Sequence, residues 1–169
     1  MTTEKTAPAL NSTQWASVAA VATAASCLGI LASLVLIYRQ VKHTRTSAVA
    51  AAFSKALEIL QDEARRIDRR TVFALEAVPL EKWAEDQKLA AERVIHSYDQ
   101  VATMVQAHMF SKDLVVDNWG HSLRNAKPVL MPLVRQYREK WKSSEVWDGF
   151  EWLCDEAERA NRKQAQRTS

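Results

Sequence analysis

The chain has 169 residues, of which 47% are hydrophobic and 25% charged, and its 23 Lys and Arg against 20 Asp and Glu leave a formal net charge of +3. This composition is typical of a folded globular protein and excludes an intrinsically disordered chain. With only 3 Gly and 4 Pro, collagen-like and turn-rich all-β architectures are excluded because they need special backbone angles far more often, and an all-α fold is expected.

The first predicted element covers residues 15–38, after a short N-terminal segment of residues 1–14. These 24 residues contain no Asp, Glu, Lys, Arg or His. At about 1.5 Å per residue the helix is roughly 36 Å long, enough to cross a hydrocarbon core of about 30 Å. Trp15 and Tyr38 stand at its two ends, where aromatic side chains favour the headgroup level. We therefore predict a single transmembrane helix over residues 15–38, with the lipid bilayer as its partner.

A cleaved signal peptide and a lipoprotein signal are the alternatives to this span. A signal peptide has a basic start and an apolar stretch of about 7–15 residues, whereas here Glu4 offsets Lys5 and the apolar stretch is longer. A lipoprotein signal would use Cys27, but the eleven apolar residues that follow it up to Tyr38 would then be left stranded. The membrane span is therefore favoured over both.

The charges that flank this segment predict its orientation. Arg39, Lys42 and Arg45 follow it as further interface anchors, and Lys5 alone precedes it. Because cytoplasmic flanks are enriched in Lys and Arg, residues 1–14 are expected outside the cytoplasm and the C-terminal body inside it. After Arg45 the chain has 19 basic and 19 acidic residues. No nucleic-acid partner is expected, since such binding needs clustered positive charge.

Small side chains repeat along the membrane segment at 3-4-3-4 spacing: Ala19, Ala22, Ser26, Gly29 and Ser33. Such a seam lets two helices approach closely, which suggests a homo-oligomer. Twelve of the 24 residues are Ala, Gly, Ser or Thr, so the pattern also arises easily by chance, and the oligomeric state stays open.

Residues 39–61 are predicted to form a basic flank and a helical stalk, because neither Pro nor Gly occurs between Gly29 and Pro79. A helix break is also predicted near Gln61 and Asp62. One apolar stripe at 4-3-4-3 spacing runs along the stalk and past this break: Phe53, Leu57, Leu60, Ala64 and Ile67.

A small cytosolic helical bundle is predicted over residues 62–160, followed by a flexible tail over residues 161–169. Further helices are expected at about residues 83–109, 111–125 and 128–141, and after Ser144. Two of them have an apolar face that we expect to form the core: Ala91, Val94, Ile95, Tyr98, Val101, Ala102, Val105 and Met109 in one, and Val146, Trp147, Phe150, Leu153, Cys154 and Ala157 in the other.

Four arginines form a candidate interaction cluster on the side of their helix opposite its apolar residues: Arg65, Arg66, Arg69 and Arg70. Such a cluster can bind phosphate groups or an acidic partner protein. The alternative, which we favour, is pairing inside the protein with Asp62, Asp68, Glu76 or acidic residues of the last helix.

Two polar groupings could carry chemistry. Glu92, His96 and Asp99 have ligand-like spacing on one helix, but they lie opposite its apolar face, so a solvated surface is favoured and no metal is predicted. Asp117 could orient His121 as a catalytic base, but no partner nucleophile is identifiable. We predict no catalytic residue and no cofactor, and an enzyme is less favoured than a binding protein.

Several short segments have a characteristic order and spacing: Glu63–Arg66, Val72–Phe73, Tyr98–Val101, Asp113–Val115, Trp119–Gly120, Pro132 with Arg138, and Phe150–Leu153. Through them the chain resembles, over about residues 30–157, the family known as domain of unknown function 4760. The resemblance implies a bacterial inner-membrane location and no catalytic assignment. The family's recurring polar and aromatic positions look like Arg65, Arg66, Asp99, Trp119 and Trp152 in this chain.

These observations favour an inner-membrane protein whose cytosolic bundle is a protein-interaction or scaffold module for an unknown partner. Arg65 or Arg66 is expected to pair with Asp99 or Glu151 and so lock the bundle, while Trp152 either packs on a neighbouring helix or contacts the partner. The alternatives are a membrane-tethered, metal-dependent hydrolase or nuclease, and an accessory subunit of a larger membrane complex.

Overall fold

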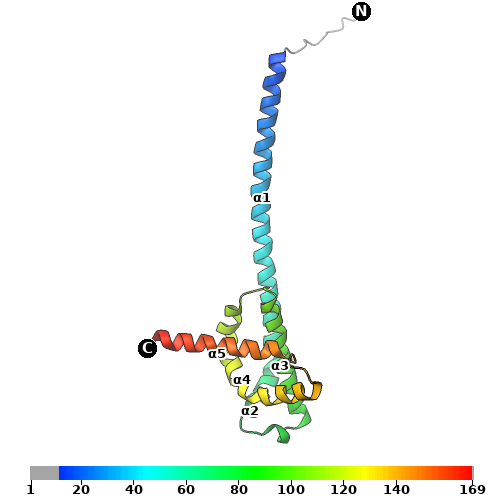
Figure 1. Cartoon of the computed structure of the whole chain (residues 1–169), viewed down its shortest axis with the longest axis vertical. Coiled ribbons are helices and arrows are strands. Elements are labelled where there is room, and N and C mark those ends of the chain that lie inside the picture. The colour runs from blue at the N-terminus through cyan, green and yellow to red at the C-terminus, as the bar shows by residue number, and fades with distance from the viewer. Residues whose placement is uncertain (1–11, 169) are drawn as a thin grey trace, which may run out of the picture. The chain divides into compact units, whose positions relative to one another are not determined.

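The structure, a computed structural model, describes residues 12–168 (Figure 1), with the side chains of residues 12–22, 24, 25, 27, 28, 32 and 168 outside the description. The regular secondary structure of residues 12–168 is helical: α1 (Ser12–Gln61), α2 (Glu63–Ala74), the 3₁₀ turn η1 (Leu80–Lys82), α3 (Glu85–Gln106), α4 (Lys112–Trp141) and α5 (Asp148–Thr168). The predicted all-α fold is confirmed for this part of the chain.

The chain divides into two compact units, Met1–Thr46 and Ser47–Ser169. The second unit therefore starts inside α1, and residues 47–61, which we expected in a stalk, belong to the helical bundle. Ala52, Ala56 and Leu60 are buried in its core. The bundle thus begins before residue 62, because the last turns of α1 have an apolar face that packs against the other helices.

The first unit exposes large apolar side chains along α1. From Ile30 to Val41, eight of them are 55% to 70% exposed. Among the described residues, no helix is both long enough and apolar enough to cross a membrane. The predicted anchor Trp15 and the seam residues Ala19 and Ala22 lie outside the described side chains.

The predicted helix break at Gln61 and Asp62 is confirmed. α1 ends at Gln61, and the Asp62 side chain accepts a hydrogen bond from the backbone N–H of Ala64 at 3.1 Å, which caps α2. The apolar stripe predicted to continue across this point is wrong beyond Leu60. Because the break starts a new helix with a different face inward, Ile67 is 53% exposed.

In the core of the second unit, α3 and α5 pack against each other through the apolar faces that were predicted for them. Residues Ala91–Val105 of α3 and Phe150–Ala157 of α5 contribute the expected buried side chains, and the rings of Tyr98 and Phe150 lie 6.2 Å apart. Cys154 is fully buried with its Sγ 3.6 Å from the carbonyl oxygen of Leu123, and burial raises the pKa of its thiol.

The end of α3 differs from the prediction by three residues. His108 adopts a φ of 57°, and the N–H of Met109 donates to the carbonyl oxygen of Met104 at 3.1 Å. This left-handed closure ends the helix. Met109, predicted to lie in the core, is therefore 44% exposed.

The two helices predicted over residues 111–125 and 128–141 are one helix, α4. It continues through Pro128 and Pro132, although each proline removes one helical hydrogen bond. Both prolines are exposed, whereas Leu130 and Val134 between and after them are buried. The bonds are thus lost on the solvent side, where water can satisfy the free carbonyls, while the buried face keeps the helix in place.

The segment predicted as a flexible tail, residues 161–169, is helical as far as Thr168 at the end of α5. Its side chains from Asn161 to Arg167 are exposed. The helix continues without core contacts because the segment is rich in Arg, Lys, Gln and Ala, which are strong helix formers.

Candidate functional site

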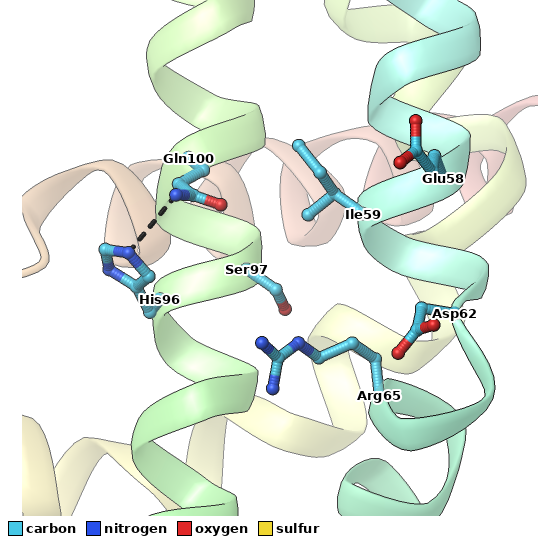
Figure 2. Close-up of a pocket in the computed structure, with 7 residues that line it drawn as sticks. All are labelled: Glu58, Ile59, Asp62, Arg65, His96, Ser97 and Gln100. Atoms are coloured by element: carbon cyan, nitrogen blue, oxygen red, sulfur yellow. Dashed lines mark hydrogen bonds between the residues drawn. The ribbon is translucent and has the colours of Figure 1, made fainter.

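A polar pocket lies between the end of α1, the start of α2 and the middle of α3. Figure 2 shows the side chains that line it: Glu58, Ile59, Asp62, Arg65, His96, Ser97 and Gln100. The pocket has a volume of about 220 Å³, below the range of about 300–1,000 Å³ typical of small-molecule sites. It brings two carboxylates, a guanidinium group and an imidazole together.

The polar groups of this pocket are engaged in local contacts. His96 Nε2 lies 3.2 Å from Gln100 Nε2, as Figure 2 shows, and Ser97 Oγ donates to the carbonyl oxygen of Val94 at 2.7 Å. The Ser97 hydroxyl is therefore not held by a base, as a nucleophile would be. In the described part of the chain, no three His, Cys, Asp or Glu side chains are placed to hold a metal ion.

Asp68 is the centre of an ion-pair network beside this pocket. The residue is only 6% exposed. Its carboxylate accepts two hydrogen bonds from Arg93 of α3, at 2.8 and 2.6 Å, and one from Arg65 at 3.2 Å. The hydrogen bonds from Arg93 hold the pKa of Asp68 below its ordinary value of 3.8. The network fastens α2 to α3, so Arg65 has an internal role.

The four arginines of the predicted cluster do not act together. Arg66 pairs with Glu63 at 2.9 Å on the surface. Arg70 is exposed and makes no ion pair among the described residues. Arg69 is half-buried, and its Nη1 atom is buried without a hydrogen-bond partner among the described residues. The arrangement therefore does not form a single phosphate-binding surface.

Asp99 joins α3 to the start of α5. Its Oδ1 accepts a hydrogen bond from the backbone N–H of Phe150 at 3.1 Å, so it caps α5 from a different helix. A Cβ at Gly149 would lie 2.8 Å from this oxygen and 3.1 Å from Ala102 Cβ. Because Gly149 has no side chain, the start of α5 can approach Asp99 and Ala102 of α3 this closely.

A second joint connects α4 to α5. Arg138 Nη1 donates to Glu151 Oε2 at 2.7 Å, and its Nε donates to the carbonyl oxygen of Val146 at 3.0 Å. The pairing predicted between Arg65 or Arg66 and Asp99 or Glu151 is therefore wrong. Asp99 instead accepts a hydrogen bond from the start of α5, and Glu151 accepts one from Arg138 of α4. These partners are far apart in the sequence, so the sequence did not indicate them.

Glu92, His96 and Asp99, for which a solvated surface was favoured over a metal site, make three separate sets of contacts. Glu92 accepts a hydrogen bond from the hydroxyl of Tyr137, which raises the pKa of Tyr137 to about 12. His96 lies in the polar pocket and Asp99 at α5.

The two candidate tryptophans have different surroundings. Trp119 is buried, and its ring meets that of Phe53 edge to face at 6.4 Å. Trp152 is half-buried and lines a groove, which we call the Trp152 groove, with a volume of about 460 Å³. The other side chains of the groove belong to α3, α4 and the turn between them: Val105, Gln106, His108, Phe110, Ser111 and Lys112.

The predicted interface anchors Tyr38, Arg39, Lys42 and Arg45 are all exposed on α1. Arg39 and Lys42, together with His43 and Thr46, surround a hollow of about 370 Å³. These residues form the second charged feature of the molecule, separate from the arginines of α2.

The model of one protein family, described as Domain of unknown function (DUF4760), matches residues 23–157. No curated protein and no solved structure shows significant similarity to the chain. The segments that carried the resemblance meet in space, since Tyr98–Val101 contacts the start of α5 through Asp99 and Arg138 contacts Phe150–Leu153 through Glu151.

Proposed function

We propose that this chain, which belongs to the family described as domain of unknown function (DUF4760), is a single-pass protein of the bacterial inner membrane. Its cytosolic helical bundle is a protein-interaction or scaffold module. Residues 15–38 form the span, the N-terminus lies outside the cytoplasm, and the basic residues after Tyr38 lie on the cytoplasmic side.

The observation that carries this proposal is the apolar surface from Ile30 to Val41. Leu34 to Tyr38 are five consecutive residues, and each is at least 55% exposed. Successive residues on a helix are 100° apart, so these side chains point in every direction around α1. A partner helix would cover one stripe only, whereas the lipid bilayer covers all sides at once.

The Trp152 groove supports an interaction role for the bundle. The groove has a volume of about 460 Å³, and its lining includes the apolar side chains of Trp152, Phe110 and Val105. Tryptophan is enriched among residues that dominate binding energy at protein interfaces. Arg65, Arg93 and Arg138 are engaged in ion pairs within the bundle, so we favour the groove over these charged residues as the contact site for a partner.

Crosslinking in intact cells, followed by mass spectrometry of the membrane fraction, tests the proposal. The wild type is expected in that fraction with a specific crosslinked partner, and Trp152→Ala is expected to lose it. Trp141→Ala is the matched control, because Trp141 is 65% exposed and lies outside the groove. Circular dichroism verifies that both variants fold. Recovery of the wild type in the soluble fraction, or the same crosslinks in all three proteins, would contradict the proposal.

A further inference from the structure

We infer that one face of α1, formed by Arg39, Lys42 and His43, binds the phosphate of an anionic phospholipid headgroup. This inference rests on the proposed membrane attachment and names the lipid class that the attachment selects. The three residues, with Thr46, are called the basic face.

The geometry places these side chains together. Positions 39, 42, 43 and 46 fall within an arc of about 100° on an α-helix, and the four side chains surround one hollow of about 370 Å³. The Thr46 hydroxyl donates to the carbonyl oxygen of Lys42 at 3.0 Å, so it is not free to donate to a ligand. The donors available to an anion are the guanidinium, the ammonium and the imidazole.

The positive charge of the basic face has no counter-charge nearby on the helix. Between residues 12 and 57 the sequence contains no Asp or Glu, and Glu58, the first carboxylate, already pairs with Lys55 at 2.8 Å. Glu58 lies 15 positions beyond His43 of the basic face, about 22 Å along the helix, which is more than twice the Debye length of about 8 Å. In the bundle, by contrast, Lys127 and Arg138 each pair with a carboxylate.

An anion is therefore the ligand that the basic face fits, and phosphate matches its donors. The planar fork of Arg39 can bind two phosphate oxygens at once, while Lys42 contributes a point charge. The arrangement distinguishes an anionic lipid from a zwitterionic one, because only the anionic lipid brings net negative charge to the uncompensated cations.

The neighbouring residues favour a phosphate carried by a lipid over free phosphate. One helical turn before Arg39, on the same face, stand Val35 and Leu36, which are 57% and 67% exposed. The face therefore changes from apolar to cationic within a single turn of about 5.4 Å. A phospholipid has the same arrangement, because its apolar acyl chains lie next to a charged phosphate.

Native mass spectrometry of the full-length protein in detergent tests the inference, with added phosphatidylglycerol or phosphatidylcholine. The wild type is expected to retain phosphatidylglycerol preferentially, and Arg39→Gln is expected to reduce its retention about fivefold, as for loss of one basic residue at an anionic surface. Arg45→Gln removes the same charge from the same segment but outside the arc, and it is expected to lose clearly less of the lipid than Arg39→Gln does.

Equal retention of the two lipids by the wild type, or equal losses in Arg39→Gln and Arg45→Gln, would overturn the inference. Complete displacement of phosphatidylglycerol by millimolar inorganic phosphate would overturn it too, because the ligand would then be free phosphate. Fractionation of the cells separates this failure from that of the proposed function. A wild type found in the membrane without lipid preference refutes the inference alone, and a soluble wild type refutes the proposed function.

Discussion

At the scale of single residues, Gly149 and Asp99 determine how closely α5 approaches α3. Asp99 reaches the backbone N–H of Phe150 at 3.1 Å only because position 149 has no Cβ. The carboxylate also meets the positive end of the α5 dipole, which adds to the hydrogen bond. The contact therefore fixes the point at which α5 begins.

Gly149→Ala is expected to lower the free energy of unfolding by about 1–3 kcal/mol, as for other overpacked sites, because its Cβ would lie 2.8 Å from Asp99 Oδ1. Urea unfolding followed by circular dichroism measures the effect. Gly120→Ala is the matched control. There the nearest atom, at 3.3 Å, belongs to the flexible end of Arg124, so the change is expected to be neutral or to stabilise the helix by up to about 1 kcal/mol. Equal effects of the two substitutions would contradict this account.

The ion pair of Asp68 with Arg93 predicts a dependence of stability on pH. Because the folded-state pKa of Asp68 lies below its ordinary 3.8, its contribution is present above that value and is lost as the pH falls through the lower, folded-state pKa. Arg93→Gln is expected to reduce the free energy of unfolding at pH 7 by about 1–2 kcal/mol, a value that allows for the partial exposure of Arg93.

Urea titrations of Arg93→Gln and the wild type at a series of pH values check this expectation, and the difference between them should shrink below pH 3.8. Arg70→Gln is the control, since Arg70 is exposed and unpaired among the described residues, and it should leave the stability unchanged. A difference that is constant down to pH 2 would show that Asp68 is not its source.

The sequence identified residues of the candidate site more readily than their partners. The resemblance pointed to Asp99, yet the hydrogen bond that Asp99 accepts comes from a backbone N–H 51 positions later, and periodicity carries no information on such a contact. Arg93 was missed altogether, because an arginine on the polar side of a helix is most simply interpreted as solvated. Nothing in the sequence marked Gly149 as a contact site, except that glycine is rare in a chain with only 3 Gly.

At the scale of helices, α4 shows how packing overrides a local signal. A helix boundary was predicted just before Pro128, but Pro128 and Pro132 both lie on the exposed side of a continuous helix. Most of the apolar faces of α3 and α5, in contrast, were predicted correctly, because a long 3.6-residue pattern reports directly on burial. The exceptions lie outside the helix ends: Met109 follows α3 and is exposed, and Val146 and Trp147 precede α5 and are half-buried. Beyond Leu60 the predicted stripe failed, because the cap at Asp62 starts a new helix that turns a different face to the core.

Pro132→Ala is expected to raise the free energy of unfolding by about 1–2 kcal/mol, because it restores a helical hydrogen bond and gives up only the proline's restriction of the unfolded chain. Pro79→Ala has the opposite expectation, a loss of about 0.4–1 kcal/mol, since Pro79 precedes η1 with a φ of −58° and interrupts no helix. Chemical unfolding of both variants compares the signs. A loss of stability in Pro132→Ala would show that the proline ring itself is needed for packing.

At the scale of the whole molecule, the boundary at Ser47 separates two kinds of surface. The first unit carries the exposed apolar residues from Ile30 to Val41, and the second buries its apolar residues in a core of its own. A domain with its own core can fold alone.

A fragment of residues 47–169 is therefore expected to be soluble without detergent and to unfold cooperatively, with a Tm within about 5 °C of that of the bundle in the full chain. Calorimetry on both proteins makes the comparison. A fragment starting at residue 62 is the control. It lacks the buried Ala52, Ala56 and Leu60 and should be markedly less stable. Equal stability of the two fragments would show that the end of α1 contributes nothing to the core.

The complete burial of Cys154 gives the bundle an internal reporter of its own opening. Burial raises the pKa of this thiol and keeps reagents from it, so an alkylating reagent added under native conditions is expected to react when the bundle transiently opens. In a variant that also carries Cys27→Ser, the rate of iodoacetamide incorporation would measure how often the bundle opens. A ligand or partner that binds the folded bundle would slow that reaction, so its binding could be detected before it was identified.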